Sequence, residues 1–355
     1  MLAEGFTKAR TMHFPRQVLA GHEVVGEIGK MSKDFELGGT ALLVTGPTTG
    51  SLAAKVVSDI LADEGYTVHS ITTGEASKDN LVKVEEKTKE VGAAFLVGIG
   101  GGSKIDLAKL ASGNMRMPFL SVPTSASHDG IASPRASIRD GGNSLSLNAN
   151  VPLGIVADTA LIVKAPYRLL ASGCADVISN TTAILDWELA ARLRSEFFSS
   201  SAANLAKYAA ESIIENAAAI KPNLEDSVWV AIRPIIISGI SMAVASSSRP
   251  TSGSEHMFSH VLDKTAPGKA LHGEQCGVGS IMMMYLHGGD WERIREALHL
   301  VGAPTNAEEL GVSPEQVIDA LVHAHEIRKD RYSILGDRGL TPDAAERLAK
   351  ITSVI

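Results

Sequence analysis

The sequence holds 355 residues, 45% of them hydrophobic, and carries a formal net charge of -7 from 33 basic and 40 acidic side chains. A chain of this length buries a large core and has room for two domains. Its mildly acidic balance, without a basic run, gives no reason to expect binding to nucleic acid or to a membrane surface, and no apolar stretch reaches the roughly 18 residues of a membrane-spanning helix.

The N-terminal residues and the cysteines indicate a cellular location. The first ten residues, MLAEGFTKAR, lack the apolar segment of a signal peptide. Cys174 and Cys276 are the two cysteines of the chain and lie far apart in the sequence, which favours reduced thiols over a disulfide. We therefore expect a cytoplasmic protein.

Strand and helix patterns alternate with short connections in the first 160 residues. Residues 1–40 show little periodicity and predict no element. After them, strands are predicted at 41–45, 67–71, 95–97, 119–122 and 154–156, helices at 51–64 and 78–90, and a hairpin or loop at 137–150. This order is typical of a parallel sheet with helices on both faces.

The second half of the sequence is helical throughout. Segments rich in Ala, Ile and Leu at helical spacing cover 166–194, 201–219, 226–247, 272–287 and 314–328, and strand patterns disappear. The pattern predicts an α/β domain at 1–160 followed by an all-α domain at 161–355, with the ligand site in the cleft between them.

A glycine-rich turn follows the strand predicted at 95–97. Gly98 and Gly100 to Gly102 remove side chains from the turn, and Ser103 is expected to cap the helix that comes next. Backbone N–H groups at such a helix N-terminus favour a phosphate. The spacing matches neither the Rossmann fingerprint nor the P-loop, because Ser103 stands where each requires glycine. The alternative is an ordinary glycine-rich turn without a ligand.

A polar loop, 123–130, follows the strand predicted at 119–122. It contains Thr124, Ser125, Ser127 and Asp129. Ligands of open α/β sheets collect at the carboxyl ends of the strands. We therefore expect this loop to line the same site.

Three polar features in the helical half form a candidate metal site. Asp176 lies near the start of an apolar helix, His256 and His260 are four residues apart on one helical face, and His272 follows a loop. One carboxylate and two imidazoles are the ligands of a divalent metal that keeps an open position, as catalytic zinc does. A helix cap at Asp176 and a polar face at the histidines are the structural alternatives.

These residues together resemble a known family. The motif Gly100-Gly101-Gly102-Ser103 with Asp106 and Lys109, the run PTSASHDGIASP at 123–134, and Asp176, His256 and His272 are similar to the archaeal sn-glycerol-1-phosphate dehydrogenases. That family belongs with the glycerol dehydrogenases, the iron-containing alcohol dehydrogenases and, more distantly, dehydroquinate synthase. The resemblance covers nearly the whole chain, and PTSASHDGIASP is its most specific part.

The resemblance implies a cofactor site and a metal site. It implies that a nicotinamide cofactor, NAD or NADP, contacts the following residues: Gly100, Gly101, Gly102, Ser103, Asp106, Thr124, Ser125, Ser127 and Ser133. It assigns one Zn²⁺ per subunit to Asp176, His256 and His272. The iron enzymes carry a further histidine ligand four residues after the aspartate, where this chain has Asn180, a poor ligand for a transition metal, and this favours zinc over iron.

The implied activity is the reversible reduction of dihydroxyacetone phosphate to sn-glycerol 1-phosphate, for archaeal-type glycerophospholipids. Asp129, Asp176 and His260 would contact the substrate, with Asp129 and His260 as catalytic groups; His260 or metal-bound water would supply the proton.

Two contacts stay open at this stage. The groups that could bind the substrate phosphate are the turn 251–254, Arg249 and Lys264. Glu75 would favour NAD, whereas Thr72 and Thr73 would accept the 2′-phosphate of NADP.

Three other functions are compatible with parts of the sequence. They are a glycerol or other polyol dehydrogenase of the same fold, a cyclising lyase resembling dehydroquinate synthase, and a non-catalytic nucleotide-binding protein. The lyase needs several basic contacts, and the loop after Pro123 is rich in serine and poor in lysine. The partners expected are a small-molecule substrate and further copies of the chain in a homo-oligomer, with no nucleic acid and no stable membrane insertion.

Overall fold

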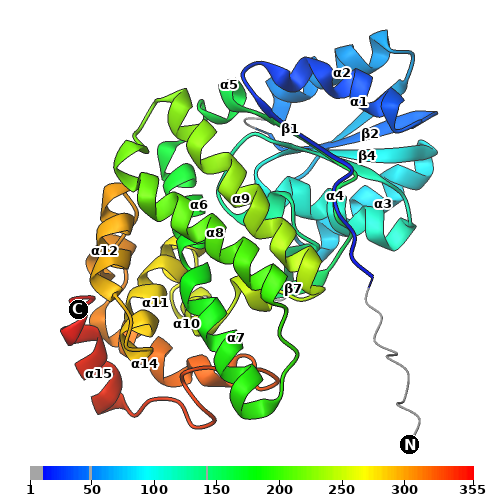
Figure 1. The fold of residues 1–355 in the computed structure, drawn as a ribbon. Coiled ribbons are helices and arrows are strands. Elements are labelled where there is room, and N and C mark those ends of the chain that lie inside the picture. Colours follow the sequence, from blue (N-terminus) through cyan, green and yellow to red (C-terminus); the bar gives the residue numbers. More distant parts are fainter. Residues whose placement is uncertain (1–10, 48–49, 141–142) are drawn as a thin grey trace, which may run out of the picture.

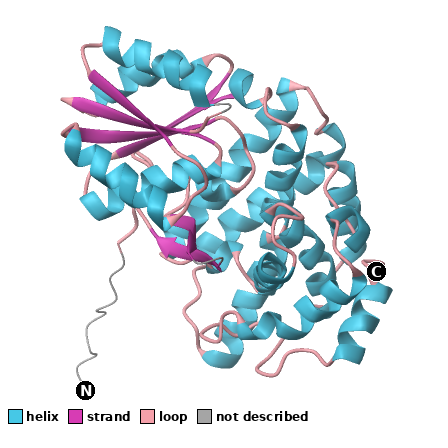
Figure 2. Ribbon diagram, turned by 180° about the vertical axis from the view of Figure 1, so that it is seen from behind, coloured by secondary structure: helices cyan, strands magenta, loops and turns pink. Residues whose placement is uncertain are grey.

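The computed structural model describes residues 11–47, 50–140 and 143–355. An α/β part is followed by a helical part, as the sequence predicted (Figure 1, Figure 2). The sheet has the strand order β1-β8-β5-β4-β2-β3, and every neighbouring pair is parallel. Its strands are β1 (Gln17–Gly21), β2 (Thr40–Thr45), β3 (Thr67–Thr72), β4 (Ala93–Gly100), β5 (Phe119–Pro123) and β8 (Gly154–Asp158).

Helices cover both faces of this sheet. Alternate residues of β2 show why: Ala41 and Leu43 pack with α1 (Ile28–Asp34) and α2 (Gly50–Asp63), whereas Leu42 and Val44 belong to the core on the other face. That second face is covered by α3 (Lys78–Glu90) and α4 (Gly102–Met115). The short helix η1 (Val24–Glu27) precedes α1. A strand buried on both faces has to be apolar at every position, which made these strands visible in the sequence.

The α/β part departs from the sequence prediction in residues 1–40, where β1, η1 and α1 were not predicted, and at the cap of α4. The edge strand β1 was missed because its residues, QVLAG, are few and show no alternation. Ser103 does not cap α4: the helix begins at Gly102, its N-cap residue is Gly101, and no side chain caps it. The predicted hairpin at 137–150 is present as the antiparallel pair β6 (Arg135–Asp140) and β7 (Asn143–Asn148).

The helical part contains all five long segments that the sequence predicted. The segment 166–194 is divided at Ser179 into two helices, and α12 and α15 were not predicted. The helices are α5 (Thr159–Ile162), α6 (Tyr167–Ile178), α7 (Asn180–Arg194), α8 (Ser200–Asn216), α9 (Glu225–Ala245), α10 (Ser254–Thr265), α11 (His272–Leu286), α12 (Trp291–Leu300), α13 (Ala307–Leu310), α14 (Pro314–His323) and α15 (Pro342–Ile351), with short turns η2 (Asp129–Ile131), η3 (Ala217–Ala219), η4 (Arg249–Thr251) and η5 (Ala324–Glu326).

The sequence predicted no apolar stretch of membrane-spanning length, but helix α9 is long and apolar enough to cross a membrane by length and composition, with a mean hydropathy of 1.9. However, 67% of this stretch is buried inside the protein. Its buried face packs against α8, α6 and the turn η2 of the α/β part. We therefore describe α9 as a core helix.

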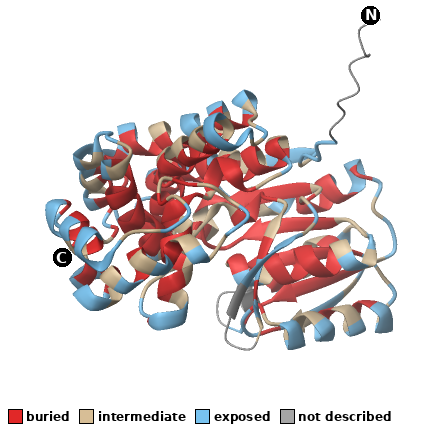
Figure 3. Cartoon of the chain, turned by 90° about the horizontal axis from the view of Figure 1, so that it is seen from below, coloured by how far each residue is buried: buried red, intermediate tan, exposed pale blue. Residues whose placement is uncertain are grey.

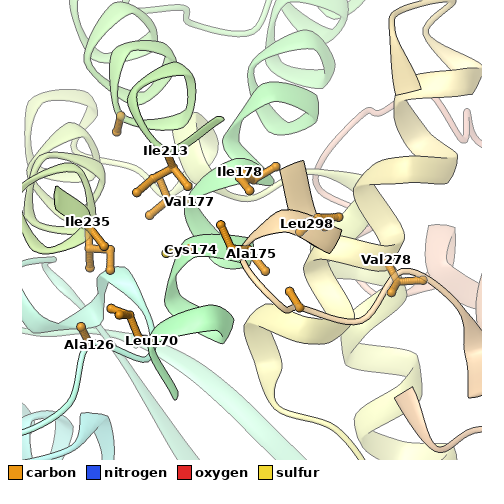
Figure 4. Close-up of a cluster of buried hydrophobic side chains, with 14 of the residues drawn as sticks. Ala126, Leu170, Cys174, Ala175, Val177, Ile178, Ile213, Ile235, Val278 and Leu298 are labelled. Atoms are coloured by element: carbon orange, nitrogen blue, oxygen red, sulfur yellow. The ribbon is translucent and has the colours of Figure 1, made fainter. Parts of the chain in front are cut away.

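Helix α6 lies at the centre of the helical core. Figure 4 shows Leu170, Cys174 and Val177 of α6 among apolar side chains of neighbouring helices. Buried residues fill the interior of both parts, and the exposed ones lie on the outer helices (Figure 3). Because α6 also carries Asp176, this core fixes one of the candidate metal ligands.

Candidate active site and metal centre

A single cleft of about 640 Å³ is lined by residues of both parts of the chain. Most residues that the sequence placed in the site line it: Gly100, Gly101, Gly102, Ser103, Asp106, Ser125, Ser127, Asp129, Ser133, Asp176, His256, His260 and His272. Thr124 is the exception. It is buried, and its backbone N–H donates to the carbonyl of Gly100 at 2.9 Å, so it joins β5 to the glycine turn and does not line the cleft.

The glycine turn gives one end of the cleft a bare backbone. Gly100 has a φ of 147°, and a Cβ atom there would lie 2.7 Å from Cγ of Lys104. A Cβ atom on Gly102 would lie 1.8 Å from Nε2 of His128. Since α4 begins at Gly102, its N-terminal amides and the positive end of its dipole face the cleft. This end is suited to a phosphate or pyrophosphate.

Lys109 and Asp106 hold the wall next to the glycine turn. The ammonium group of Lys109 is fully buried and donates to the carbonyl of Arg135 at 2.6 Å, to that of Gly130, and to Asp106 Oδ1 at 3.3 Å. The other oxygen of Asp106 accepts from the backbone N–H of Ser137 at 2.9 Å. The pair therefore ties α4 to η2 and β6.

Asp129 lies where the two halves of the cleft meet. Its backbone N–H donates to Asp176 Oδ2 at 3.1 Å, and its own Oδ2 accepts from the hydroxyl of Ser238 on α9 at 2.8 Å. Burial, and then the neighbouring carboxylate of Asp176, raise the pKa of Asp129 to about 7. A carboxyl group with such a pKa is suited to carrying a proton near neutral pH.

Asp176, His256 and His272 bring their ligand atoms together from three helices. Asp176 Oδ1 lies 3.8 Å from Nε2 of His256 and 3.8 Å from Nε2 of His272. The two imidazole rings are 4.9 Å apart between centroids. These separations allow one cation to be held between the three groups.

The second nitrogen of each imidazole has its own partner. Nδ1 of His256 is 2.9 Å from Oε1 of Glu255, and Nδ1 of His272 is 3.1 Å from the hydroxyl of Ser259. A carboxylate or hydroxyl at Nδ1 fixes the ring and leaves Nε2 available to a metal. Glu255 is itself fixed, because it accepts from Thr182 at 2.9 Å and from the backbone N–H of Gly253 at 2.6 Å.

The electrostatic state of these groups fits a bound cation. Burial, and then His260, lower the pKa of His256 to about 3, so its imidazole is neutral as a metal ligand must be. Burial, and then the negative charge of Glu255, raise the pKa of Asp176 to about 7, so its carboxylate needs compensation by a positive charge. A divalent metal between the three groups would supply that compensation.

Cys276 is a fourth ligand-type residue that the sequence analysis missed. The ligand atoms of Asp176, His256, His272 and Cys276 all lie within 4.8 Å of one another, and Sγ of Cys276 is 3.7 Å from Nε2 of His272. The signal was available, since Cys276 follows His272 by four residues on α11 and so shares its helical face.

Asn180 does not turn toward this group of ligands. Its amide nitrogen donates to the hydroxyl of Ser238 at 2.9 Å and to the carbonyl of Ala206 at 3.3 Å. Ser238 in turn donates to Asp129. Asn180 therefore supports Asp129 from behind, at the position where the iron enzymes were expected to carry a metal ligand.

His260 lines the cleft one helical turn beyond His256. Its ring is stacked on that of His272, with 6.0 Å between centroids, and its Nδ1 lies 3.7 Å from Oδ2 of Asp263. His260 therefore lies beside the candidate metal ligands but does not belong to the group of converging ligand atoms.

Several of the phosphate contacts proposed from the sequence are occupied by carboxylates or lie outside the cleft. The N–H of Gly253 donates to Glu255, and that of Ser254 donates to Asp186 Oδ2 at 2.7 Å. The guanidinium of Arg249 is bound by both oxygens of Glu196, each at 2.8 Å. Lys264 is exposed and does not line the cleft. Carboxylates therefore occupy the amides of Gly253 and Ser254, whereas Ser252 of the same turn lines the cleft.

Comparisons with known proteins agree with this geometry. The family described as iron-containing alcohol dehydrogenase matches residues 19–166. The glycerol-1-phosphate dehydrogenase [NAD(P)+] of Methanosarcina acetivorans is 56% identical over 98% of this chain and 97% of its own length. That of Methanothermobacter thermautotrophicus is 53% identical over 98% of this chain and 99% of its own length.

Solved structures show the same fold. Glycerol dehydrogenase from Schizosaccharomyces pombe superposes with a TM-score of 0.80 at 20% identity, over 98% of this chain and 91% of that one. An iron-containing alcohol dehydrogenase from Thermotoga maritima gives 0.73 at 18% identity, over 97% and 99%. The chain thus belongs to the glycerol-1-phosphate dehydrogenases, NAD(P)-dependent oxidoreductases with the fold of the iron-containing alcohol dehydrogenases.

Proposed function

We propose that the chain catalyses the reversible reduction of dihydroxyacetone phosphate to sn-glycerol 1-phosphate, with NADH or NADPH as the hydride donor. The observation that supports this most strongly is the shared cleft. A bare helix N-terminus at Gly100 to Gly102 and the donor group of Asp176, His256 and His272 line its two halves. A nicotinamide cofactor and a metal-bound carbonyl substrate need this combination side by side.

We assign the metal to Asp176, His256 and His272, and we infer that it is Zn²⁺. When bound, it would act as a Lewis acid that draws charge from the substrate carbonyl. A catalytic zinc keeps one position open, whereas four protein ligands give a closed, structural site. We therefore leave Cys276, which is buried next to His272, outside the set of metal ligands.

The cofactor would lie from the glycine turn to Asp129. Its pyrophosphate is assigned to Gly100, Gly101, Gly102 and Ser103, and the hydride would leave C4 of its nicotinamide ring. Ser125, Ser127 and Ser133 line the same side of the cleft. Asp106 is held by Lys109 and by the N–H of Ser137, and the N–H of Thr124 donates to Gly100, so we assign both residues to support of the loop.

Two groups are placed to hold the proton that must follow the hydride. Asp129 has a pKa raised to about 7 by burial and by Asp176, so near neutral pH it exchanges a proton readily. His260 lines the cleft beside His272, and Asp263 orients its ring. We assign Asp129 to contact with both the cofactor and the substrate, and His260 to the exchange of protons with solvent.

The pair Glu75 and Arg139 accounts for the use of both cofactors. Both residues line the cleft, and Nη1 of Arg139 is 3.1 Å from Oε2 of Glu75. A carboxylate accepts the ribose hydroxyls of NAD, and a guanidinium binds the 2′-phosphate of NADP. Thr73 is not a candidate any longer, because it is buried and its hydroxyl donates to the carbonyl of Thr45.

The proposal includes a cytoplasmic homo-oligomer with a domain boundary near residue 160. The boundary follows β8, which ends at Asp158. Self-association is supported by apolar side chains that are exposed on and beside α8 and α9, namely Tyr208, Leu224 and Trp229.

A substrate panel tests the proposed function. The purified protein, freed of metal and reloaded with Zn²⁺, should oxidise NADH and NADPH with dihydroxyacetone phosphate far faster than with dihydroxyacetone, and glycerol should be a poor substrate for the reverse reaction. Equal rates with the two ketones would favour a polyol dehydrogenase instead. Reloading with Fe²⁺ in parallel tests the metal, because higher activity with Fe²⁺ would contradict the assignment of zinc.

A further inference from the structure

A group of arginines lies at the metal end of the cleft, and the site as described so far does not use it. The group consists of Arg135 on β6, Arg328 after η5, and Arg331. Arg135 and Arg328 line the cleft, together with Ser248 and Ser252 of the turn before α10. Arg331 stands directly behind that turn, where its guanidinium donates to the hydroxyl of Ser248 at 2.9 Å and to the carbonyl of Ser252 at 3.3 Å.

The charges of this group are poorly compensated within the described residues. Arg331 forms no ion pair there. The guanidinium of Arg135 donates hydrogen bonds to neutral groups of Ser146 and Asn148. Arg328 has one acidic partner, Asp330, at 3.5 Å, and the side chain of Asp330 is 71% exposed. By contrast, Arg249 nearby is neutralised by two short bonds to Glu196.

The arginines are close enough to act on one another. Burial, and then the charge of Arg328, lower the pKa of Arg135. Burial, and then Arg328 and Arg249, lower the pKa of Arg331 to about 9. Cations that repel one another in a half-buried place lose that repulsion when an anion binds between them.

The group also lies at the right end of the cleft for a substrate. The charges of Arg331 and Arg328 act on His256, the metal ligand on α10. In dihydroxyacetone phosphate one methylene and one ester oxygen separate the carbonyl from the phosphate. A substrate whose carbonyl is held at the metal therefore keeps its phosphate close to the metal ligands, in the part of the cleft where the charge of Arg328 acts on His256.

We propose that Arg328, with Arg135 across the cleft and Arg331 behind the turn, binds the phosphate of the substrate. This inference rests on the proposed function and names the part of the site that separates a phosphorylated ketone from an unphosphorylated one. Arg328 contacts the phosphate, and Arg331 fixes the turn of Ser248 and Ser252 and adds positive charge. Guanidinium groups suit this task because they offer several donors to the oxygens of a phosphate.

Steady-state kinetics of Arg328→Ala test the proposal, with Lys264→Ala as the control because Lys264 is an exposed cation of the same half outside the cleft. We expect the KM for dihydroxyacetone phosphate and the inhibition constant of inorganic phosphate to rise about 10- to 100-fold in Arg328→Ala. The rate with dihydroxyacetone, the KM values for NADH and NADPH, and the metal content should stay unchanged. Lys264→Ala should match the wild type throughout.

Other outcomes would overturn the proposal. An equal loss with both ketones would show a structural role of Arg328, and a higher KM for NADPH alone would assign the arginines to the cofactor's 2′-phosphate. Unchanged inhibition by phosphate would remove Arg328 from the site. Arg331→Lys keeps the positive charge and disturbs the fold less than Arg331→Ala would. It should raise the KM for dihydroxyacetone phosphate by a smaller factor than Arg328→Ala does. A wild type without preference for the phosphorylated ketone would refute the proposed function itself, whatever the variants do.

Discussion

At the scale of single residues, hydrogen bonds to neighbouring side chains determine which ligand atoms of the candidate metal centre are available to a metal. Nδ1 of His256 and of His272 is engaged by Glu255 and by Ser259, which leaves both Nε2 atoms turned toward Asp176. The neighbours of the ligands thus determine which nitrogen binds. A similar division holds for Asp176, whose Oδ2 accepts from Asp129 while Oδ1 faces the histidines.

Substitution of the proposed ligands should separate them from Cys276. His256→Ala and His272→Ala should each lose the bound metal and the dehydrogenase activity, because two donors hold a divalent ion weakly. Cys276→Ser should keep the metal at one per subunit, since we place the cysteine outside the set of metal ligands. Metal content after dialysis and thermal unfolding of each variant give the readouts. Full metal occupancy in either histidine variant, or its loss in Cys276→Ser, would contradict the ligand set.

At the scale of helices and strands, close packing of α6 and α11 brings Asp176 and His272 together. A Cβ atom on Gly273 would lie 2.0 Å from the backbone carbonyl of Ser172, and one on Gly173 would lie 1.9 Å from that of Ala126. Backbone atoms cannot move aside as a side chain does, so both glycines are required by the crossing of these elements.

Gly273→Ala should therefore force α6 and α11 apart. We expect it to lower the free energy of unfolding by about 1–3 kcal/mol, the usual cost of overpacking, and to weaken metal binding as well. Gly38→Ala is the control, because a Cβ atom there would meet nothing within 4 Å. Urea unfolding with and without added metal measures both effects. A Gly273→Ala protein as stable as the Gly38→Ala control would show that the helices can adjust.

The sequence predicted these elements where burial imposed a simple pattern. Strands β2 and β4 are apolar on both faces, and α9 is apolar over most of its length, so both kinds of element were visible. Strand β1 lies at the edge of the sheet and pairs with β8, which is more than a hundred residues away in the sequence. The residues QVLAG alone do not predict this pairing. The cap at Gly101 was missed for a local reason, since a serine two residues later offered a stronger signal than a bare glycine.

The ligands of the candidate metal site were predicted from the sequence, but most of the residues that support them were not. Asp176, His256 and His272 were found from residue type, helical spacing and family resemblance, and they do converge. The contacts of Ser238 with Asp129 and of Lys109 with Arg135 could not be predicted, because folding alone brings these residues together. Glu255 precedes His256 directly in the sequence, but its contact with Nδ1 became visible only in the structure. The contacts of the substrate phosphate were left open by the sequence. Proximity to His256 suggested the turn 251–254, in which carboxylates occupy the amides of Gly253 and Ser254, whereas Ser252 lines the cleft.

At the scale of the whole molecule, the cleft joins two halves with separate tasks. The α/β half presents amides at the ends of its strands, and the helical half presents the carboxylate and imidazoles. Contacts of α9 with η2 and β1 connect the two halves. The geometry between hydride donor and carbonyl is set by this connection, and that geometry decides which face of the ketone is reduced.

The chirality of the product is therefore the most direct test of the proposed function. The zinc-loaded protein is incubated with NADPH and dihydroxyacetone phosphate, and the glycerol phosphate formed is assayed with an enzyme that oxidises only the 3-phosphate enantiomer. We predict that the product is sn-glycerol 1-phosphate and that this enzyme leaves it untouched. Formation of sn-glycerol 3-phosphate, or of a racemic mixture, would contradict the proposed function.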